Sequence, residues 1–365
     1  MTSVTTRRRF AKGAAAVPSL IAAARFGTWA SAADATPEAS ARIGLLPPAE
    51  GLTQYPLTLS TAWGEVTIPT RPERVVAASW RGELSWLLAL GVTPVAAESA
   101  EWANQAVPWA PEMLAQPIEH TWDYMEVALE PEPIAAAKPD LIWAGSLGAE
   151  PVPNLKALQA IAPVLAQPDA GDEVVSWQEN LLMVGEALDL KQAAQKVIDD
   201  YETFFAEFRK EHPAFADKTI AFVEFWGDSA GNEIWFGNPV GSELDTFFSR
   251  LGFAPNPGEL TDAEALSPEL VGLIQGDVLM IVDYSPPEDE GKQFQEFVNS
   301  ALYQSIPAVQ NDHVIRLSNP ERIMLYQDGV EVGPTAHPSI AYDDPIGSPR
   351  YAQMIAPLIE AALAD

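Results

Sequence analysis

The stretch EPIAAAKPDLIW at residues 132–143 decides the fold, because a similar stretch returns as ELVGLIQGDVLM at residues 269–280. In both copies a Glu opens a short helical segment, a Pro or Gly then breaks it, and an Asp leads into an apolar, strand-like run. One copy lies in each half of the chain, which predicts two similar lobes. Each lobe then carries one acidic residue, Glu132 or Glu269, at the start of a short helix. Two matched carboxylates favour docking onto a two-part partner over a single catalytic centre.

Strand-like and helix-like patterns alternate on both sides of the two copies. Apolar runs predict strands at residues 55–60, 65–69, 74–78, 93–97, 140–144, 219–225, 277–283 and 313–317, the first two as a hairpin. Helices are predicted at residues 84–90, 242–251 and 347–364. Such alternation is typical of a parallel sheet covered by helices. We therefore predict an α/β protein with two Rossmann-like lobes.

The longest predicted helix covers residues 191–211, where apolar side chains recur three and four positions apart. A His-Pro pair ends it. At ~1.5 Å per residue this helix would span on the order of 30 Å, the width of a small domain. We interpret residues 191–213 as a rigid connection between an N-terminal lobe at 55–190 and a C-terminal lobe at 214–365, with a ligand cleft between the lobes. An ordinary surface helix is the alternative.

Residues 1–32 have the pattern of an export signal. Arg7 and Arg8 begin a twin-arginine motif, an apolar run follows, and small residues end at Ala32. The run is too short and contains a Pro, so we do not expect it to span a membrane. We predict export through the twin-arginine route to the periplasm or cell envelope, with a basic disordered tail as the alternative. Residues 33–54 are rich in Ala, Pro and Gly, which predicts a flexible tether.

The composition argues against several classes of function. The formal net charge is −30 at pH 7, and such an acidic surface disfavours nucleic acid and anionic membranes as partners. It suits docking onto basic patches. The chain has no Cys, which excludes disulfides, thiolate metal sites and a lipid-modified N-terminal Cys. Its four His are scattered without the spacing of metal ligands, so we predict no metal site and no cofactor. We expect a monomer.

Several runs, taken in their order, resemble one known family. These runs are residues 55–69, RPERVV at 71–76, LLALGV at 87–92, KPDLI at 138–142 and IAPV at 161–164. From about residue 55 to its end the chain is similar to solute-binding proteins of the ferric-siderophore, haem and cobalamin class. The resemblance implies two α/β lobes joined by one long helix, a ligand cleft between them, and delivery of the ligand to an ABC importer.

The same resemblance implies a role for the two matched carboxylates. Glu132 and Glu269 would pair with Arg residues on the two permease subunits of the importer. The alternative for each Glu is a favourable charge at a helix N-terminus, worth only ~0.3–1 kcal/mol. The chain departs from many Gram-positive members of the family because it lacks the anchoring Cys. How it stays near the importer is therefore open.

Aromatic and basic residues gather in the loops around the predicted strands. Ligands of open α/β sheets bind at the carboxyl ends of strands, and this aromatic set suits a large, flat, partly apolar ligand. The two Arg would neutralise an anionic chelate. Core packing is the alternative for each aromatic residue, and a surface salt bridge for each Arg. The predicted ligand-binding residues are Trp80, Arg81, Trp102, Trp122, Tyr124, Trp226, Trp235, Tyr284 and Arg322.

We therefore predict an extracytoplasmic binding protein, not an enzyme, that captures an iron-siderophore or a similar chelate and delivers it to ABC permease subunits. Hydroxamate, catecholate and carboxylate siderophores, haem and cobalamin are all open as ligands. The alternative is a secreted serine hydrolase, because Ser146 lies in a run that resembles a nucleophile elbow. Asp283 with His313 or His337 could complete its triad. The Pro residues that follow this run argue against the helix that an elbow requires.

Overall fold

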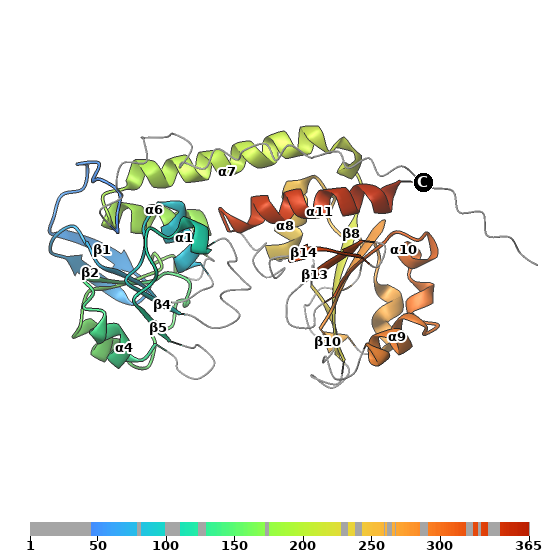
Figure 1. Cartoon of the computed structure of the whole chain (residues 1–365), viewed down its shortest axis with the longest axis horizontal. Coiled ribbons are helices and arrows are strands. Elements are labelled where there is room, and N and C mark those ends of the chain that lie inside the picture. Colours follow the sequence, from blue (N-terminus) through green and yellow to red (C-terminus); the bar gives the residue numbers. More distant parts are fainter. Residues whose placement is uncertain are drawn as a thin grey trace, which may run out of the picture. The chain divides into compact units, whose positions relative to one another are not determined.

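Two extended β-sheets, one in each half of the chain, organise the structure (Figure 1). The described part of the chain forms a two-stranded hairpin, a five-stranded sheet and a seven-stranded sheet. The hairpin strands, β1 (Leu57–Thr61) and β2 (Gly64–Ile68), pair antiparallel as predicted. The computed structural model describes residues 45–78, 82–98, 110–122, 129–171, 175–227, 233–237, 243–258, 260, 265–266, 268–284, 291–318, 324–327, 330–334 and 344–364.

The N-terminal lobe is built on the five-stranded sheet, in which every described pair is parallel. Its strands, in the order β5-β4-β3-β6-β7, are β3 (Val75–Ala77), β4 (Ala96–Glu98), β5 (His120–Trp122), β6 (Leu141–Ala144) and β7 (Val164–Ala166). They are short and apolar, as expected where helices cover both faces of a sheet. The helices of this lobe are α1 (Glu83–Ala89), α3 (Ala110–Met113), α4 (Pro131–Ala136), α5 (Leu155–Gln159) and α6 (Trp177–Ala187). Helices α1 and α6 pack on one face, and α4 and α5 on the other.

The C-terminal lobe differs because its sheet is mixed. Strands β8, β11 and β12 are parallel, and the described pairs outside them are antiparallel. In the order β10-β9-β8-β11-β12-β13-β14, the strands are β8 (Ile220–Gly227), β9 (Glu233–Phe236), β10 (Ala265–Leu266), β11 (Val278–Asp283), β12 (Val314–Ser318), β13 (Met324–Gln327) and β14 (Val330–Pro334). The parallel centre agrees with the prediction, whereas the antiparallel edges were not predicted. Strands β9, β13 and β14 are antiparallel because the connections from β8 to β9 and from β12 to β14 are too short for a crossover, whereas β10 joins β9 after a longer connection through α8.

Helices cover both faces of this second sheet. One face packs against α8 (Glu243–Leu251) and α11 (Gly347–Leu363). The other face packs against η3 (Pro268–Leu273), α9 (Lys292–Val298), η5 (Tyr303–Ser305) and α10 (Pro307–Gln310). The buried clusters of the two faces alternate along β8, as the period of a strand requires: Phe222 belongs to the first and Val223 to the second.

Helix α7 (Lys191–Glu211) joins the two halves, and its bounds agree with the prediction. It packs against α6 on one side of the connection and against α8 on the other. The ring of Phe205 meets that of Phe247 edge-on, with centroids 6.3 Å apart. Arg250 of α8 forms an ion pair with Glu202 of α7 at 2.9 Å. Aromatic packing together with surface charge therefore attaches α7 to the C-terminal lobe. A short helix, η1 (Pro213–Phe215), follows it.

Residues 45–54 belong to the segment expected to be flexible, but hydrogen bonds tie them to the end of α6 and the start of α7. The Asp189 carboxylate accepts backbone N–H groups of residues 51, 52 and 53 at 2.7–2.9 Å. Burial raises the pKa of this carboxyl, but the three backbone bonds outweigh burial and leave it below its usual value. Glu50 accepts the N–H groups of Gln192 and Ala193, both at 2.8 Å, and so caps α7. The rest of the predicted tether, residues 33–44, and the predicted signal at 1–32, including Arg7 and Arg8, lie outside the described residues.

The Asp in each copy of the repeated stretch anchors the start of a neighbouring strand. Asp140 accepts the backbone N–H groups of Glu73 and Arg74, at 2.9 and 2.8 Å, just before β3. Asp277 accepts the N–H and the hydroxyl of Thr219, at 2.8 and 2.9 Å, just before β8. The repeat therefore fixes how the strand that follows it pairs with the first parallel strand of its sheet.

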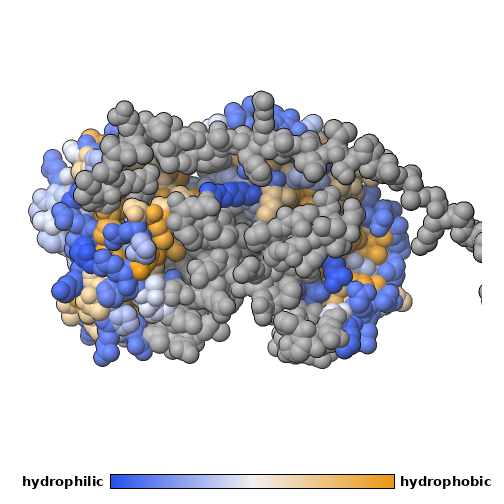
Figure 2. Space-filling view, viewed as in Figure 1, coloured by the Kyte–Doolittle hydropathy of each residue, from blue (hydrophilic) through white to orange (hydrophobic). Residues whose placement is uncertain are grey.

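The described surface mixes polar and apolar residues, and Figure 2 shows hydrophobic residues between hydrophilic ones on the face drawn. Among the described residues, the large hydrophobic side chains that are at least 36% exposed are Leu52, Trp235, Leu270, Leu273 and Leu302. Within the same residues, none of the helices combines the length and the apolarity that crossing a membrane requires.

Candidate functional site

Three of the predicted ligand-binding residues lie on one face of the C-terminal sheet. Trp226 is near the carboxyl end of β8, and Tyr284 directly follows the neighbouring parallel strand β11. Their rings stack, with centroids 4.4 Å apart and 16° between the planes. Trp235 of β9 is 36% exposed and pairs directly across from Glu224, which puts it on the same face as Trp226. Tyr284 is only 8% exposed and Trp226 is half-buried, so Tyr284 supports the stack from the core and the aromatic surface of this face is formed by Trp226 and Trp235.

A carboxylate lies beside this aromatic surface. Glu224 Oε2 accepts a hydrogen bond from Trp226 Nε1 at 3.2 Å. Partial burial raises the pKa of the Glu224 carboxyl, and the bond from Trp226 opposes this rise only in part. Burial and the charge of Glu224 together raise the pKa of Tyr351 on α11. Sequence reasoning missed Glu224, and the available signal was an acidic residue inside an otherwise apolar strand.

The N-terminal lobe holds a second carboxylate, also at the carboxyl ends of parallel strands. Glu83 opens α1, and Ser146 lies two residues beyond β6. The fully buried Glu83 carboxylate accepts the Ser146 backbone N–H at 2.8 Å and the Ser146 hydroxyl at 2.5 Å. Burial raises its pKa to about 7, against the opposing effect of the two bonds from Ser146. Sequence reasoning also missed Glu83, although a Glu at the start of an apolar helix was a signal for it.

The described surroundings of Ser146 do not form the catalytic triad of the hydrolase alternative. The Ser146 hydroxyl donates to Glu83 rather than to a His. Asp283 pairs with Arg316 at 2.9 Å, and His313 Nδ1 lies 3.0 Å from the carbonyl oxygen of Asp277. Both residues belong to the C-terminal lobe, whereas Ser146 follows a strand of the N-terminal sheet. His337 lies outside the described residues.

The glycine before this serine has a packing role. A Cβ at Gly145 would lie 2.3 Å from the indole ring of Trp143, which is fully buried beneath the sheet end. Trp143 in turn packs near Trp86 of α1, with ring centroids 6.3 Å apart. The glycine in the run that resembles a nucleophile elbow is therefore explained by the close packing of Trp143 next to Trp86 of α1.

The remaining predicted ligand-binding residues separate into two groups. Trp122 is 7% exposed and packs in the cluster that includes Ile134 of α4, so it belongs to the core of the N-terminal lobe. The others lie outside the described residues: Trp80, Arg81, Trp102, Tyr124 and Arg322. The described residues also bring no three His, Asp or Glu side chains together as a possible metal site.

The two predicted docking residues lie on corresponding short helices. Glu132 is exposed in the first turn of α4, and Glu130 beside it is also exposed. Glu269 lies in η3 of the C-terminal lobe. Each helix precedes the Asp that anchors a neighbouring strand, so the repeated stretch has an equivalent position in the two lobes.

Comparisons with known proteins cover most of the chain. The family model described as "Periplasmic binding protein" matches residues 75–321. The iron(3+)-hydroxamate-binding protein YxeB of Bacillus subtilis is 26% identical over 264 residues, which cover 70% of this chain and 76% of that protein. A periplasmic solute binding protein from Mycobacterium smegmatis has a TM-score of 0.65 at 22% identity, covering 84% and 99% of the two chains. PiaA of Streptococcus pneumoniae, solved in complex with ferrichrome, has a TM-score of 0.59 at 19% identity, covering 84% and 98%.

These matches decide the class of the protein. At their low identity the solved structures support the fold alone, and they confirm an α/β protein with two lobes, each built on a sheet with parallel strands. The family model covers more than half of the chain, and the family consists of binding proteins, so the prediction that the chain is not an enzyme is also confirmed. The chain belongs to the periplasmic binding protein family.

Proposed function

We propose that this chain is the iron-siderophore-binding component of an ABC uptake system. The observation that carries the proposal is the stack of Trp226 on Tyr284, at the carboxyl ends of parallel strands in a binding-protein fold. A flat aromatic surface suits a large, partly apolar chelate, whereas a sugar calls for many neutral hydrogen-bonding groups. The names of a sequence relative that binds iron(3+)-hydroxamate and of a structural neighbour solved with ferrichrome support the same class.

Among the ligands left open, we favour a ferric hydroxamate. Fe³⁺ held by three hydroxamate groups carries no net charge, whereas catecholate and carboxylate chelates of Fe³⁺ are anionic. The Glu224 carboxylate beside the stack disfavours an anion at this position. Arg81 and Arg322 favour the opposite choice, an anionic chelate. A titration with ligands of both charges therefore separates the two predictions.

Quenching of tryptophan fluorescence tests the proposal directly. Ferrichrome, a ferric catecholate, a ferric carboxylate chelate, haem and cobalamin are titrated into the purified chain. Ferrichrome should bind most tightly, and Trp226→Ala should weaken its binding at least about tenfold. Tight binding of only the anionic chelates would reject the hydroxamate and favour Arg81 and Arg322 as contacts. Absence of binding by all five compounds would reject the proposed function.

Delivery to the importer is proposed to depend on Glu132 and Glu269, each paired with an Arg of one permease subunit. Replacing both with Ala should abolish uptake of the chelate into cells, while the affinity of the free protein for ligand stays within about twofold. Glu65→Ala with Glu211→Ala is the matched control, because it removes the same charge from exposed positions outside α4 and η3. Near-normal uptake by the first variant would reject this docking role.

Export through the twin-arginine route is the last part of the proposal, and it places the chain outside the cytoplasm as its family requires. Arg7→Lys with Arg8→Lys should leave a full-length precursor in the cytoplasm. Arg25→Lys, a change of the same kind outside the twin-arginine pair, should be exported normally. Cell fractionation with detection of the chain distinguishes the outcomes, and normal export of the double variant would indicate the general secretory route.

A further inference from the structure

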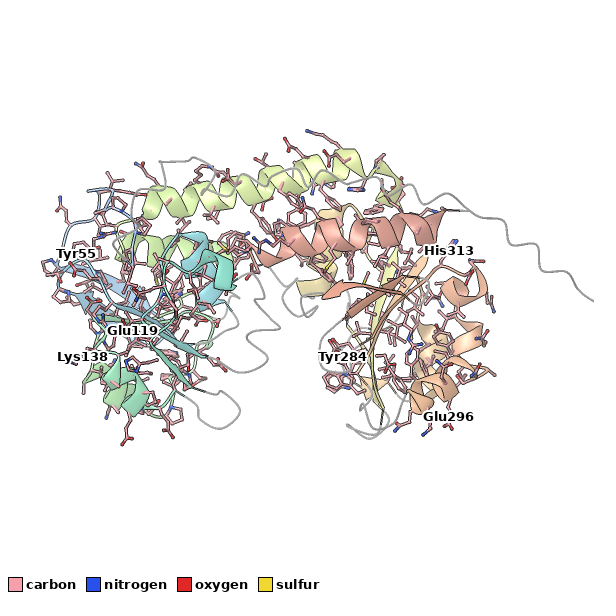
Figure 3. All side chains as sticks on the ribbon, in the orientation of Figure 1. Tyr55, Glu119, Lys138, Tyr284, Glu296 and His313 are labelled. Atoms are coloured by element: carbon pink, nitrogen blue, oxygen red, sulfur yellow. The ribbon has the colours of Figure 1, made fainter. Side chains whose placement is uncertain are left out.

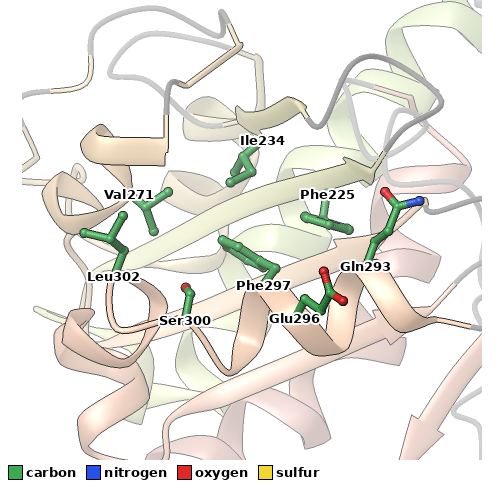
Figure 4. A pocket seen from close by; sticks show the side chains of 8 residues that line it. All are labelled: Phe225, Ile234, Val271, Gln293, Glu296, Phe297, Ser300 and Leu302. Atoms are coloured by element: carbon green, nitrogen blue, oxygen red, sulfur yellow. The ribbon is translucent and has the colours of Figure 1, made fainter.

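A pocket of about 250 Å³ opens on the C-terminal lobe, on the face of the sheet opposite to the Trp226–Tyr284 stack (Figure 4). Phe225 of β8 lies in this pocket and belongs to the buried cluster under α9, whereas its neighbour Trp226 packs against the cluster of the other face. Figure 3 places Tyr284 and the pocket residue Glu296 on separate parts of this lobe. The pocket is therefore distinct from the proposed chelate site.

The size and lining of the pocket fit one apolar side chain. Sites for small organic ligands measure ~300–1,000 Å³, so a ferric chelate is too large for this pocket. Its floor is formed by Phe225, Ile234 and Val271, which are 4%, 3% and 1% exposed. Phe297 stacks on Phe225, with ring centroids 5.0 Å apart. Such a rigid aromatic and aliphatic lining is typical of the pockets that receive anchor residues in protein interfaces.

Exposed leucines lie on the elements that frame this pocket. Leu270 and Leu273 of η3 are each 38% exposed, and Leu302 at the pocket edge is 40% exposed. Element η3 contacts η5, and Leu302 directly precedes η5. Single exposed leucines need no explanation, but three on adjoining elements beside a pocket mark a surface for a protein partner.

The charge of this surface indicates the chemistry of that partner. Glu296, an exposed residue of α9, lines the pocket, and the structure gives its carboxylate no hydrogen bond or ion pair with the described residues (Figure 4). The same short helix η3 that supplies Val271 to the pocket also carries Glu269. The complementary partner therefore presents an apolar side chain next to basic groups, not an acidic peptide or a second copy of this chain, whose net charge is −30.

We propose that this pocket receives one apolar side chain from a loop of the permease subunit whose Arg pairs with Glu269. The inference rests on the proposed function, because it assumes docking onto an ABC importer. A stable interface buries roughly 800 Å² on each partner, far more than one carboxylate offers. A contact centred on Glu269 therefore extends over Leu270 and the mouth of the pocket. Among the described residues around Glu132, the exposed neighbours on and before α4 are Glu130, Ala135 and Ala136, and none of these is a large apolar side chain.

Docking of the full chain to its importer, held in nanodiscs, tests the proposal by biolayer interferometry at low and high salt. Leu270→Ser with Leu302→Ser should weaken docking roughly ten- to a hundredfold, mainly through faster dissociation and at both salt concentrations. Leu52→Ser is the matched control, because Leu52 is 56% exposed at a site in the first half of the chain. It should dock like the unchanged protein. The charge variant Glu132→Ala should slow association only at low salt.

The outcomes separate this inference from the proposed function. The Leu270→Ser/Leu302→Ser variant could dock normally while the Glu132→Ala/Glu269→Ala variant does not dock. This result would reject the role of the pocket and support the docking role of the two Glu. Equal weakening by Leu52→Ser also overturns the role of the pocket, because the effect would then be general hydrophobic adhesion. If the unchanged protein binds ferrichrome but does not dock at all, both this inference and the delivery to an importer are overturned.

Discussion

The two lobes anchor their sheets in the same way but expose different surfaces. Asp140 and Asp277 each close the start of a neighbouring parallel strand, and each follows a short helix that carries a Glu. Around that shared unit, the N-terminal sheet is parallel throughout its described pairs, whereas the C-terminal sheet gains antiparallel edges. The repeated stretch therefore determines strand pairing at the centre of each sheet and leaves the edges and the outer helices free to differ.

The two lobes also differ in what they place at the carboxyl ends of their parallel strands. The N-terminal lobe has a buried Glu83 that binds Ser146, and the C-terminal lobe has Glu224 beside the Trp226–Tyr284 stack. Burial raises the pKa of both carboxyls. In the first lobe the carboxylate shapes the backbone after β6, and in the second it orients an indole.

The largest effect is expected from comparing two tryptophans. Trp122→Ala should cost about 3–5 kcal/mol of unfolding free energy, because it empties a site in the core of the N-terminal lobe. It should leave ferrichrome affinity nearly unchanged. Trp226→Ala should cost less than about 2 kcal/mol, because the ring is only half-buried, and should lower affinity instead. Urea unfolding measures the stability of both variants, and fluorescence titration measures their affinity for ferrichrome. A loss of affinity in Trp122→Ala but not in Trp226→Ala would place the ligand at the N-terminal lobe instead.

The next effect concerns pH and Glu83. Its pKa rises from 4.5 to about 7 in the folded chain, so the folded state binds this proton more tightly than the unfolded state does. The resulting stability is complete below about pH 4.5 and is lost as the pH rises to about 7. Glu83→Gln mimics the protonated form: its side-chain oxygen accepts the Ser146 N–H, and its NH2 group donates to the Ser146 hydroxyl oxygen, which reverses that bond. It should therefore gain on the order of 3 kcal/mol relative to the unchanged chain at about pH 8, and nothing at about pH 4.

Unfolding measured across this pH range in both proteins checks the prediction. Glu224→Gln should change stability in the same direction, because partial burial also raises the pKa of Glu224. Identical pH dependence of Glu83→Gln and the unchanged chain would show that Glu83 is solvated in the folded state.

The shared Asp residues come next. Asp140→Ala and Asp277→Ala should each cost about 1.5–3 kcal/mol, because each removes a carboxylate that accepts two hydrogen bonds at the start of a strand. Asn at either position should recover part of the loss, since its side-chain oxygen still accepts a bond. Urea unfolding of the four variants measures these costs. A loss at one position only would show that the repeat has different roles in the two lobes.

The smallest effects concern the attachment of α7. Glu50→Ala should cost about 1 kcal/mol, because two N–H groups at the start of α7 lose their cap. Glu202→Ala removes only a surface ion pair with Arg250 and should cost less than about 1 kcal/mol. Thermal unfolding monitored by circular dichroism compares the two. A larger cost for Glu202→Ala would mean that the charge pair, rather than the aromatic packing, attaches α7 to the C-terminal lobe.

The sequence by itself was sufficient for everything that depends on local pattern. The periodicity of residues 191–211 predicted α7 with its observed bounds, and the repeated stretch predicted two lobes with β6 and β11 in equivalent places. Ordered motifs were sufficient to identify the family. These features are readable because apolar spacing and helix-breaking residues act within a few positions of the chain.

Only the tertiary structure decided which of the loop aromatic residues are available to a ligand and which charges are buried. Trp122 and Trp226 look alike in the sequence, yet one packs under α4 and the other stacks on Tyr284. Glu83 meets Ser146, and Asp189 meets residues 51–53, across long stretches of chain. The pKa of a carboxyl and the exposure of a ring depend on neighbours brought together by folding, and no local pattern encodes those neighbours.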